Sequence, residues 1–191
     1  MNDTTLKIIF VGDCGVGNTS IINRYITDSF DPNSPSSRGA SYASKKIVIE
    51  EYDLSLQLDL WDTGGGQEKY RAMKKIYYPG TSICILVYDI TSRVSFESIK
   101  TFWFGNVKEY GGNNIEFGIA GNKCDLYEEE KVNEEEAKEF AKSINAIFHL
   151  TSCKFSMGIN DLIEECVIKY LKGHNDKVRK IEKAKKAKKS N

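Results

Sequence analysis

A glycine-rich turn near the start of the chain constrains what this sequence can fold into more than any other stretch. The segment Gly12–Thr19 follows an apolar, strand-like run and precedes a helix-like run. Glycines in such a turn let backbone N–H groups converge on phosphate oxygens, and the N-terminus of the following helix adds partial positive charge. The segment matches the phosphate-loop pattern G-x-x-x-x-G-K-[ST] at Gly12, Gly17 and Thr19, with Asn18 in the lysine position. The turn therefore predicts a phosphate site, and the alternative is a tight strand-to-helix turn without a ligand.

Strand-like and helix-like segments alternate along the rest of the chain. Strands are expected at residues 6–11, 41–50, 54–60, 82–89, 115–120 and 147–150. Helices are expected at residues 19–27, 95–111, 133–144 and 161–171. This alternation predicts an α/β fold in three layers, of the P-loop NTPase type, with a mostly parallel six-stranded sheet and helices on both faces. A hairpin over residues 41–61 supplies one antiparallel edge strand. We expect Ser95 to cap the second helix, and Asn133 with Glu136 to cap the third as a capping box.

The composition is that of a soluble protein with one domain. The chain has 191 residues, of which 40% are hydrophobic and 28% are charged. Its five cysteines are far apart in sequence, which favours reduced thiols in the cytosol over a disulfide framework or a zinc site. The polar start carries no signal-peptide pattern, and the apolar run over residues 83–88 is too short to cross a bilayer. We therefore expect a cytoplasmic protein.

Charge is divided unevenly along the chain. The formal net charge is zero, but residues 177–191 hold seven lysines and one arginine against one glutamate. We predict a globular domain over residues 1–173 and a basic extension over residues 174–191. The extension is either a solvated tail or a weak contact for anionic lipid, at up to about 1 kcal/mol per basic residue. No nucleic acid is expected as a partner, because no aromatic residues are interleaved with the lysines.

Two polar motifs follow the last two predicted strands, at the edge where open α/β sheets bind ligands. The first is Asn122–Asp125 and the second is Ser152–Lys154. A carboxylate at Asp125 can accept hydrogen bonds from N1–H and the exocyclic amine of guanine, whereas adenine would leave it unpaired at a large cost. Lys123 can lay its aliphatic stem along the base, and backbone N–H groups of Ser152–Lys154 can meet the base carbonyl. The alternative for each motif is a polar turn.

Two further polar residues lie in loops that follow predicted elements. Ser37 is in the loop after the first helix, and Asp62 follows the strand whose leucines alternate over residues 54–60. Asp62 stands where enzymes with a phosphate loop carry a carboxylate that organises a magnesium ion.

In this order the motifs resemble those of a Ras-superfamily small GTPase of the Rab type. The similarity covers about residues 6–171 and includes the stretches 61–63, 67–68, 77–78 and 86–91. Tyr42, Trp61 and Tyr77 match a trio of surface aromatics that Rab proteins offer to effectors. The resemblance implies a small GTPase domain that switches between GTP and GDP in vesicle trafficking, as a monomer, peripheral on endomembranes. It also implies effector and regulator contacts through Ser37–Tyr42 and Gly64–Tyr78.

Carried over residue by residue, the resemblance implies a catalytic role for Gln67, which would position the attacking water. The implied cofactors are GTP or GDP and Mg²⁺, with Thr19, Ser37 and Asp62 as metal ligands. The implied nucleotide-binding residues are Gly12, Asp13, Cys14, Gly15, Val16, Gly17, Asn18, Thr19, Ser20, Ser37, Gly65, Asn122, Lys123, Asp125, Ser152, Cys153 and Lys154.

The chain departs from the family pattern at four places. Asn18 replaces the cationic lysine, and Ser37 stands where the switch threonine belongs. Gly64–Gly66 contains one glycine more than the family has before Gln67. The family's prenylated C-terminal cysteine has no counterpart in the sequence.

These departures lead to a specific hypothesis and two rivals. We expect a Rab-like guanine-nucleotide-binding protein with weakened nucleotide binding and very low intrinsic GTP hydrolysis. The first rival is a pseudo-GTPase, in which the same fold binds other proteins without a nucleotide switch. A more distant rival is an adenine-nucleotide enzyme with a phosphate loop, which Asp125 opposes.

Overall fold

A six-stranded sheet forms the middle layer of the computed structural model, which describes residues 4–33, 39–64, 74–176, 178–181 and 183. The strand order is β2-β3-β1-β4-β5-β6, and neighbouring strands are parallel except for β2 and β3. The strands are β1 (Thr4–Val11), β2 (Ser41–Ile49), β3 (Leu54–Asp62), β4 (Ile83–Asp89), β5 (Glu116–Asn122) and β6 (Ile147–Thr151). The predicted α/β fold with one antiparallel edge strand is confirmed.

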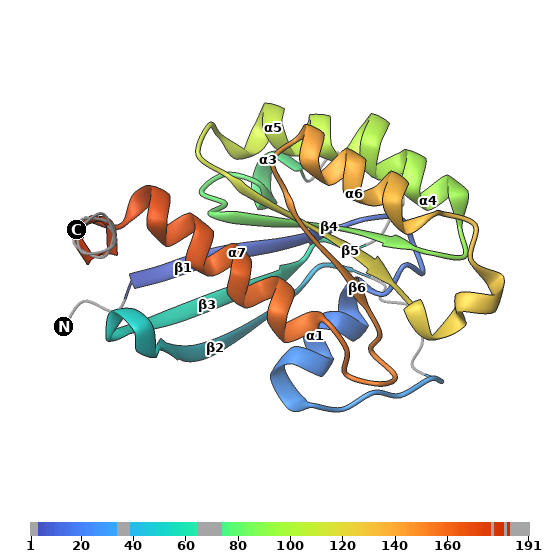
Figure 1. The fold of residues 1–191 in the computed structure, drawn as a ribbon, viewed down its shortest axis with the longest axis horizontal. Helices are drawn as coiled ribbons and strands as arrows, with labels where there is room; N and C mark the ends of the chain where they lie inside the picture. The colour runs from blue at the N-terminus through green and yellow to red at the C-terminus, as the bar shows by residue number, and fades with distance from the viewer. Residues whose placement is uncertain (1–3, 34–38, 65–73, 177, 182, 184–191) are drawn as a thin grey trace, which may run out of the picture.

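Helices cover both faces of this sheet (Figure 1). The α-helices are α1 (Asn18–Thr27), α3 (Lys74–Tyr77), α4 (Arg93–Ser98), α5 (Phe104–Gly111), α6 (Glu134–Ser143) and α7 (Ile159–His174). Shorter 3₁₀ or π-helical segments are η1 (Glu50–Tyr52), η2 (Ile99–Trp103) and η3 (Cys124–Glu129). Helices α1 and α7 lie on one face of the sheet, and α4, α5 and α6 lie on the other (Figure 1).

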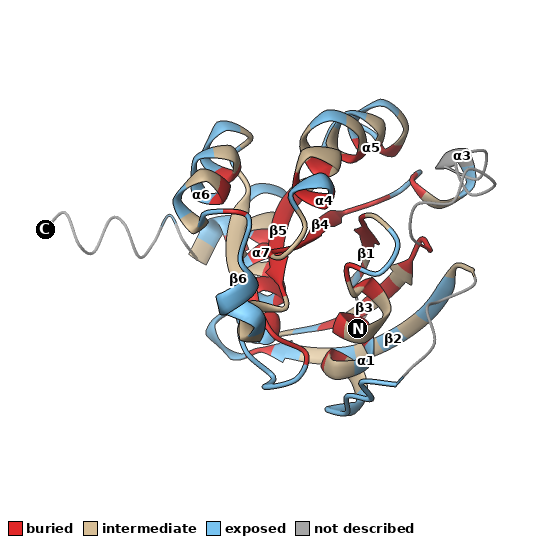
Figure 2. Ribbon diagram, turned by 90° about the vertical axis from the view of Figure 1, so that its right-hand side faces the viewer, coloured by how far each residue is buried: buried red, intermediate tan, exposed pale blue. Residues whose placement is uncertain are grey.

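Alternating side chains of the central strands build a hydrophobic core on each face. On β1, Ile8 and Phe10 belong to the core under α1 and α7, whereas Ile9 and Val11 belong to the core under α4, α5 and α6. All seven residues of β4 are buried, as a continuous apolar run predicts for a strand covered on both faces. Figure 2 shows this burial concentrated in the central strands. The loops at the carboxyl ends of the strands therefore start from rigid positions.

The helix that was expected to be capped by Ser95 begins at Arg93 instead. Ser92 is its N-cap, and the Ser92 hydroxyl accepts a hydrogen bond from the Ser95 N–H at 3.3 Å. The Ser95 hydroxyl donates to the Ser92 carbonyl at 2.8 Å and accepts from the Asp89 N–H at 3.1 Å. The prediction is wrong because both serines suit an N-cap by residue type, and only the buried position of Ser95 against the end of β4 decides between them.

Asn133 caps α6 as predicted, but the capping box does not form. The Asn133 side chain accepts a hydrogen bond from the Glu135 N–H at 2.8 Å. The carboxylate of Glu136 turns instead to Arg93 of α4, with 2.6 Å between Oε1 and Nη2. A bidentate pair with a guanidinium provides two charge-assisted hydrogen bonds, which a backbone N–H cannot match.

The packed structure continues past the boundary that was expected after residue 173. Helix α7 runs to His174, and Val178 is fully buried in the core under α1 and α7. Ile181 packs against the same core and is partly buried. The division into residues 1–173 and 174–191 stays a prediction. Val178 and Ile181, which lie after this boundary, pack against the core of the domain. No helix within the described ranges has the length and hydropathy needed to cross a membrane.

Candidate nucleotide-binding site

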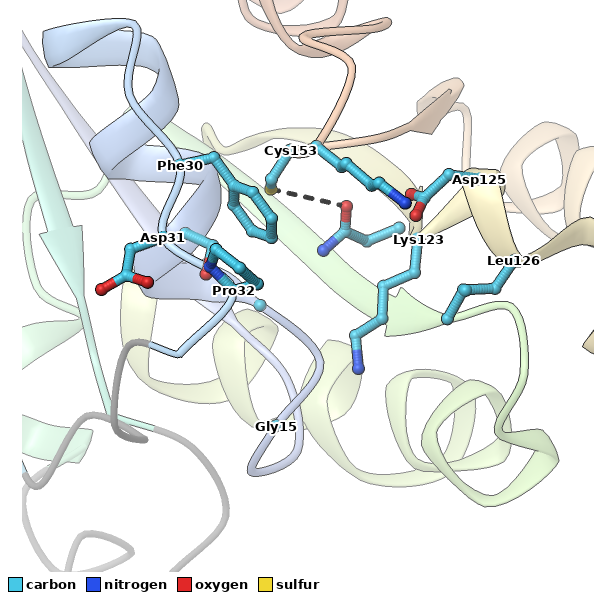
Figure 3. Close-up of a pocket in the computed structure, with 12 residues that line it drawn as sticks. Gly15, Phe30, Asp31, Pro32, Lys123, Asp125, Leu126 and Cys153 are labelled. Carbon is cyan, nitrogen blue, oxygen red and sulfur yellow. Dashed lines mark hydrogen bonds between the residues drawn. The ribbon is translucent and has the colours of Figure 1, made fainter.

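A cavity of about 450 Å³ opens at the carboxyl ends of the strands (Figure 3). Its walls come from the phosphate loop, the loop after α1, and the loops after β5 and β6. The lining residues are Gly15, Gly17, Ser20, Phe30, Asp31, Pro32, Asn122, Lys123, Asp125, Leu126, Cys153 and Lys154. This volume and this position at the sheet edge are typical of a small-molecule site in an α/β protein.

The phosphate loop requires glycine at three positions. Gly15 and Gly17 have φ angles of +83° and +104°, which side chains of L-residues rarely adopt. A Cβ on Gly12 would lie 2.3 Å from the carbonyl oxygen of Val87, and a Cβ on Gly17 would lie 2.3 Å from Nδ2 of Asn122. The loop is thus pressed against the ends of β4 and β5, with its exposed turn facing the cavity.

Asn122 fastens the phosphate loop to the two strands beside the cavity. Its Nδ2 donates to the carbonyl of Val16 at 2.8 Å, and its Oδ1 accepts from the Thr151 hydroxyl at 3.1 Å. Asn122 is 2% exposed, so these hydrogen bonds are shielded from competition with water. The side chain therefore joins the loop after β1, the end of β5 and the end of β6 into one unit.

Asp125 and Ser152 come together at the wall of the cavity, as the two motifs predict. The Ser152 hydroxyl is buried and donates to Oδ1 of Asp125 at 2.6 Å. The same hydroxyl oxygen accepts from the Phe155 N–H at 3.2 Å. The Phe155 N–H orients the Ser152 hydroxyl, which in turn orients the Asp125 carboxylate at the cavity wall.

Arg24 of α1 supports the Ser152–Lys154 loop from behind, which the sequence analysis missed. Its Nε donates to the carbonyl of Cys153 at 2.8 Å, and its Nη2 lies 3.5 Å from the carbonyl of Lys154. Nη1 donates to the carbonyl of Asp28 at 2.6 Å. With two carbonyls of this loop turned toward Arg24, the Arg24 guanidinium sets the orientation of the peptide groups that border the cavity.

Lys123 lines the cavity from a left-handed backbone position, with φ at 64°. Its ammonium lies 2.6 Å from Oδ2 of Asp89, and its stem runs alongside the cavity toward the phosphate loop (Figure 3). Although burial opposes ionisation of Asp89, hydrogen bonds from Lys123 and Thr91 hold the pKa of that carboxyl below its ordinary value. The Lys123 ammonium is therefore paired with the Asp89 carboxylate. The contact between the aliphatic stem of Lys123 and a base stays a prediction.

Thr19 and Asp62, two of the predicted magnesium ligands, are in direct contact. The Thr19 hydroxyl donates to Oδ2 of Asp62, and the Gly64 N–H donates to Oδ1 at 2.9 Å. Burial raises the pKa of Asp62 above its ordinary value, against the lowering effect of these two hydrogen bonds. A nearby cation would offset this desolvation, so the oxygens fit Mg²⁺. The described residues contain no group of three or more His, Cys, Asp or Glu suited to a metal, and Mg²⁺ often completes its shell with phosphates and water.

Asn18, in the lysine position, is a neutral side chain that is 5% exposed. Its Oδ1 is buried and has no hydrogen-bond partner among the residues that the structure describes. A buried polar atom left unpaired costs roughly 1–3 kcal/mol. Because Oδ1 accepts hydrogen bonds and ionised phosphate oxygens also only accept them, it is the Nδ2 group of this amide that could donate to a bound phosphate.

The loop after α1 contributes side chains that the sequence analysis did not single out. Phe30, Asp31 and Pro32 line the cavity, and Leu126 of η3 lines it from the opposite wall. A large aromatic residue directly before an Asp-Pro loop was the available signal. Phe30 is 37% exposed, which leaves an apolar ring surface open to a ligand.

Of the remaining predicted site residues, three lie in or beneath the phosphate loop and three are not among the residues that the structure describes. Cys14 is exposed on the phosphate loop, and Val16 is buried beneath it. The Asp13 carboxylate accepts a hydrogen bond from the indole N–H of Trp103, behind the loop, at 2.9 Å. Ser37, Gly65 and Gln67 lie outside the described residues.

Three aromatic side chains form a row at the surface, as the Rab-type pattern implies. The ring centroids of Tyr42 and Trp61 are 5.0 Å apart, and those of Trp61 and Tyr77 are 6.1 Å apart. Tyr42 is 52% exposed. The three rings therefore form a contiguous aromatic surface from strands β2 and β3 to α3.

Comparisons with known proteins agree with this geometry. The sequence model of the Ras family matches residues 7–172. Ras-related protein Rab-22A of Homo sapiens is 44% identical over 161 residues, which cover 84% of this chain and 80% of that protein. Ras-related protein Rab-31 of Mus musculus is 41% identical over 159 residues, with 83% and 80% covered. Ras-related protein Rab-2B of Dictyostelium discoideum is 35% identical over 166 residues, with 87% and 80% covered.

Replacing Arg24 with alanine should lower the free energy of unfolding by about 1.5–3 kcal/mol, the usual range for hydrogen bonds to a charged group. The carbonyl of Cys153 lies in a buried residue and would lose its donor. Urea unfolding followed by circular dichroism measures the change. The matched control is Thr27→Ala on the exposed side of the same helix, which should change stability by less than about 0.5 kcal/mol. Equal effects of the two substitutions would contradict the supporting role of Arg24.

Proposed function

The chain belongs to the Rab group of the Ras family of small GTPases, and on this premise we propose that its cavity binds GTP and GDP. The base would lie at Asp125 and the phosphates at Gly12–Thr19. Exchange between the two nucleotides would act as a switch in vesicle trafficking. The site differs from the family pattern at the phosphate end, so we also propose that nucleotide binding is weakened and that GTP hydrolysis is slow.

The observation that carries this proposal is the Asp125 carboxylate beside the cavity, oriented by Ser152 at 2.6 Å. A fixed carboxylate accepts hydrogen bonds from N1–H and the 2-amino group of guanine, and adenine lacks both donors. Phe30 and Leu126 supply apolar walls on which a flat base can pack. Backbone N–H groups of Ser152–Lys154 would meet the base carbonyl, and the stem of Lys123 would lie along the ring.

The phosphate end of the site combines backbone donors with the start of α1. N–H groups of Gly15–Ser20 would surround the outer phosphates, and the partial positive charge of the helix N-terminus favours anions there. Thr19, Ser37 and Asp62 would hold Mg²⁺, which neutralises phosphate charge when bound. The proximity of Thr19 and Asp62 supports this assignment for the two described residues.

Asn18 weakens this end of the site without removing it. A lysine in this position offers a cation to the outer phosphates, whereas the Asn18 amide can offer only a neutral hydrogen bond. Losing a charge-assisted hydrogen bond costs roughly 1.5–3 kcal/mol, which is about one to two decades of affinity. The loss should be larger for GTP, because the missing ammonium would also contact the γ-phosphate.

A pseudo-GTPase is the second candidate function, and Asn18 is the observation that favours it. In that case the aromatic row of Tyr42, Trp61 and Tyr77 would bind partner proteins whatever nucleotide is present. The ordered base site at Asp125 and Ser152 favours the nucleotide switch instead, because a module without a ligand gains nothing from a carboxylate beside an open cavity.

Effectors and regulators would contact the surfaces at Ser37–Tyr42 and Gly64–Tyr78. Tyr42 and Tyr77 of the aromatic row belong to these two segments, and the ring of Trp61 contacts both of them. We propose a monomer located in the cytoplasm and peripherally on endomembranes. The basic residues beyond 174 would add a weak contact with anionic lipid, worth up to about 1 kcal/mol per charge near the surface.

Asp125→Asn should move base preference from guanine toward xanthine. Xanthine carries a carbonyl at the 2-position, which can accept from the new amide and would repel the original carboxylate. Competition between GDP and XDP for a fluorescent nucleotide measures the change, expected to exceed about tenfold because one mismatched polar pair costs at least about 1.4 kcal/mol. Asp31→Asn removes a carboxylate from the same cavity and serves as the control. Unchanged preference in Asp125→Asn would refute the base assignment.

Asn18→Lys should raise affinity for both nucleotides, and for GTP more than for GDP. The expected gain is about 10- to 100-fold, the reverse of the loss described for the missing cation. Isothermal titration of GTP and GDP on both proteins, at constant Mg²⁺, gives the two ratios. No gain for either nucleotide would mean that the cavity is remodelled beyond the lysine, as in a pseudo-GTPase.

Single-turnover GTP hydrolysis should be about 30- to 150-fold slower than in the family, which corresponds to 2–3 kcal/mol of lost transition-state stabilisation. The cation at position 18 is missing, and the extra glycine of Gly64–Gly66 shifts Gln67 by one residue relative to Asp62. Phosphate release from preloaded GTP measures the rate, against about 10⁻⁴ s⁻¹ for Ras. Deleting one glycine together with Asn18→Lys should recover more rate than either change alone. A Ras-like rate in the unmodified protein would contradict the argument.

A further inference from the structure

We propose that Trp103 is a positioning residue for the phosphate loop and that it slows nucleotide release through Asp13. This inference rests on the proposed function, because it concerns the same cavity. It assigns a role in nucleotide binding to a side chain that lies behind the loop, on the helices that cover the opposite face of the sheet from α1.

The contact joins residues that are ninety positions apart in sequence. The indole Nε1 of Trp103 donates to Oδ1 of Asp13 at 2.9 Å. Trp103 is 5% exposed and belongs to the core formed with α4, α5 and α6. The Phe102 ring packs against it edge to face, with centroids 5.0 Å apart. The indole is therefore held in place by its own core, and its N–H is directed at the base of the phosphate loop.

A π-helical turn gives Trp103 this direction. The segment η2 (Ile99–Trp103) is π-helical, and the Phe104 N–H bonds to the carbonyl of Ile99, five residues back. An α-helix advances about 100° per residue, so the residue added by the wider turn changes the direction of the side chains that follow. Single π-turns are rare and are concentrated at functional sites. The helix here departs from regular geometry at the residue that reaches the phosphate loop.

The phosphate loop is held on both sides by a hydrogen bond from a buried side chain, Trp103 on one side and Asn122 on the other. At its far end, the Val16 carbonyl accepts from Asn122 at 2.8 Å. At its near end, Asp13 accepts from Trp103. Only Cys14 and Gly15 lie between the two anchored residues, and both are exposed. Their N–H groups would face the phosphates, so anchoring both sides lowers the conformational entropy lost when a nucleotide binds.

Anchoring matters more here than in a site with a phosphate-binding lysine. Asn18 offers no charge to hold the outer phosphates, so more of the affinity must come from backbone N–H groups in a fixed arrangement. Disturbing that arrangement should appear first in the rate of nucleotide release, since changes at one site alter dissociation more than association.

The test measures GDP dissociation from the full chain, using a fluorescent GDP analogue chased with excess GDP in Mg²⁺. Trp103→Phe keeps an aromatic ring but removes the donor, and Asp13→Ala removes the acceptor. Each should speed release about tenfold, and the double variant should release no faster than the quicker single variant. Asp13→Asn retains an acceptor oxygen and should recover most of the loss seen in Asp13→Ala. Thr101→Ala, on the same π-turn with its hydroxyl bonded to Glu97 within the helix, is the matched control.

Urea unfolding of each nucleotide-free variant separates positioning from packing. If Trp103→Phe lowers stability while GDP release is unchanged, Trp103 is a core residue only and the inference is wrong. Additive effects of Trp103→Phe and Asp13→Ala would equally overturn it. If Trp103→Phe does not fold, the comparison of Asp13→Ala with Asp13→Asn decides alone, because Asp13 lies outside the cores. Failure of the unmodified protein to bind GDP would refute the proposed function and the inference with it.

Discussion

The rest of the site depends on two hydrogen bonds made by the side-chain amide of Asn122. It donates to the phosphate loop at Val16 and accepts from Thr151 at the end of β6. A neutral carboxamide provides both a hydrogen-bond donor and an acceptor. One buried side chain therefore joins the phosphate loop to the end of β6, although these two segments are far apart in sequence. The wall of the cavity at Asp125 and the wall at the phosphate loop therefore keep a constant separation, as the proposed binding of a nucleotide would require.

This arrangement explains why the substitution at position 18 need not abolish binding. The loop's shape is set by glycines pressed against β4 and β5 and by Asn122, not by the side chain of residue 18. Asn18 occupies a preformed loop and leaves one carboxamide oxygen buried without a partner in the described chain. The departure from the family is thus a change in electrostatics within an intact framework, and under the proposed function its cost would fall on the phosphates instead of the base.

The sequence predicted those features that local patterns determine. The continuous apolar run of β4 led to the correct sheet, and the polar motif ending at Asp125 led to the edge of it at which the cavity lies, because strand periodicity and strand ends are local properties. The supporting contacts could not be predicted. Arg24 meets the carbonyl of Cys153, and Trp103 meets Asp13, only after the chain has folded. Ser92 and Ser95 were confused for the same reason, since tertiary burial decides between two equivalent caps.

The central claim is that this chain binds guanine nucleotides selectively despite Asn18. The most direct measurement is an isothermal titration calorimetry experiment, in which nucleotide-free protein is titrated with GDP and, separately, with ADP at the same Mg²⁺ concentration. The account predicts saturable binding of one GDP per chain, with an affinity at least about a hundredfold above that for ADP, because adenine leaves the Asp125 carboxylate unpaired. Equal affinities for the two nucleotides, or no binding of GDP at millimolar concentration, would contradict it.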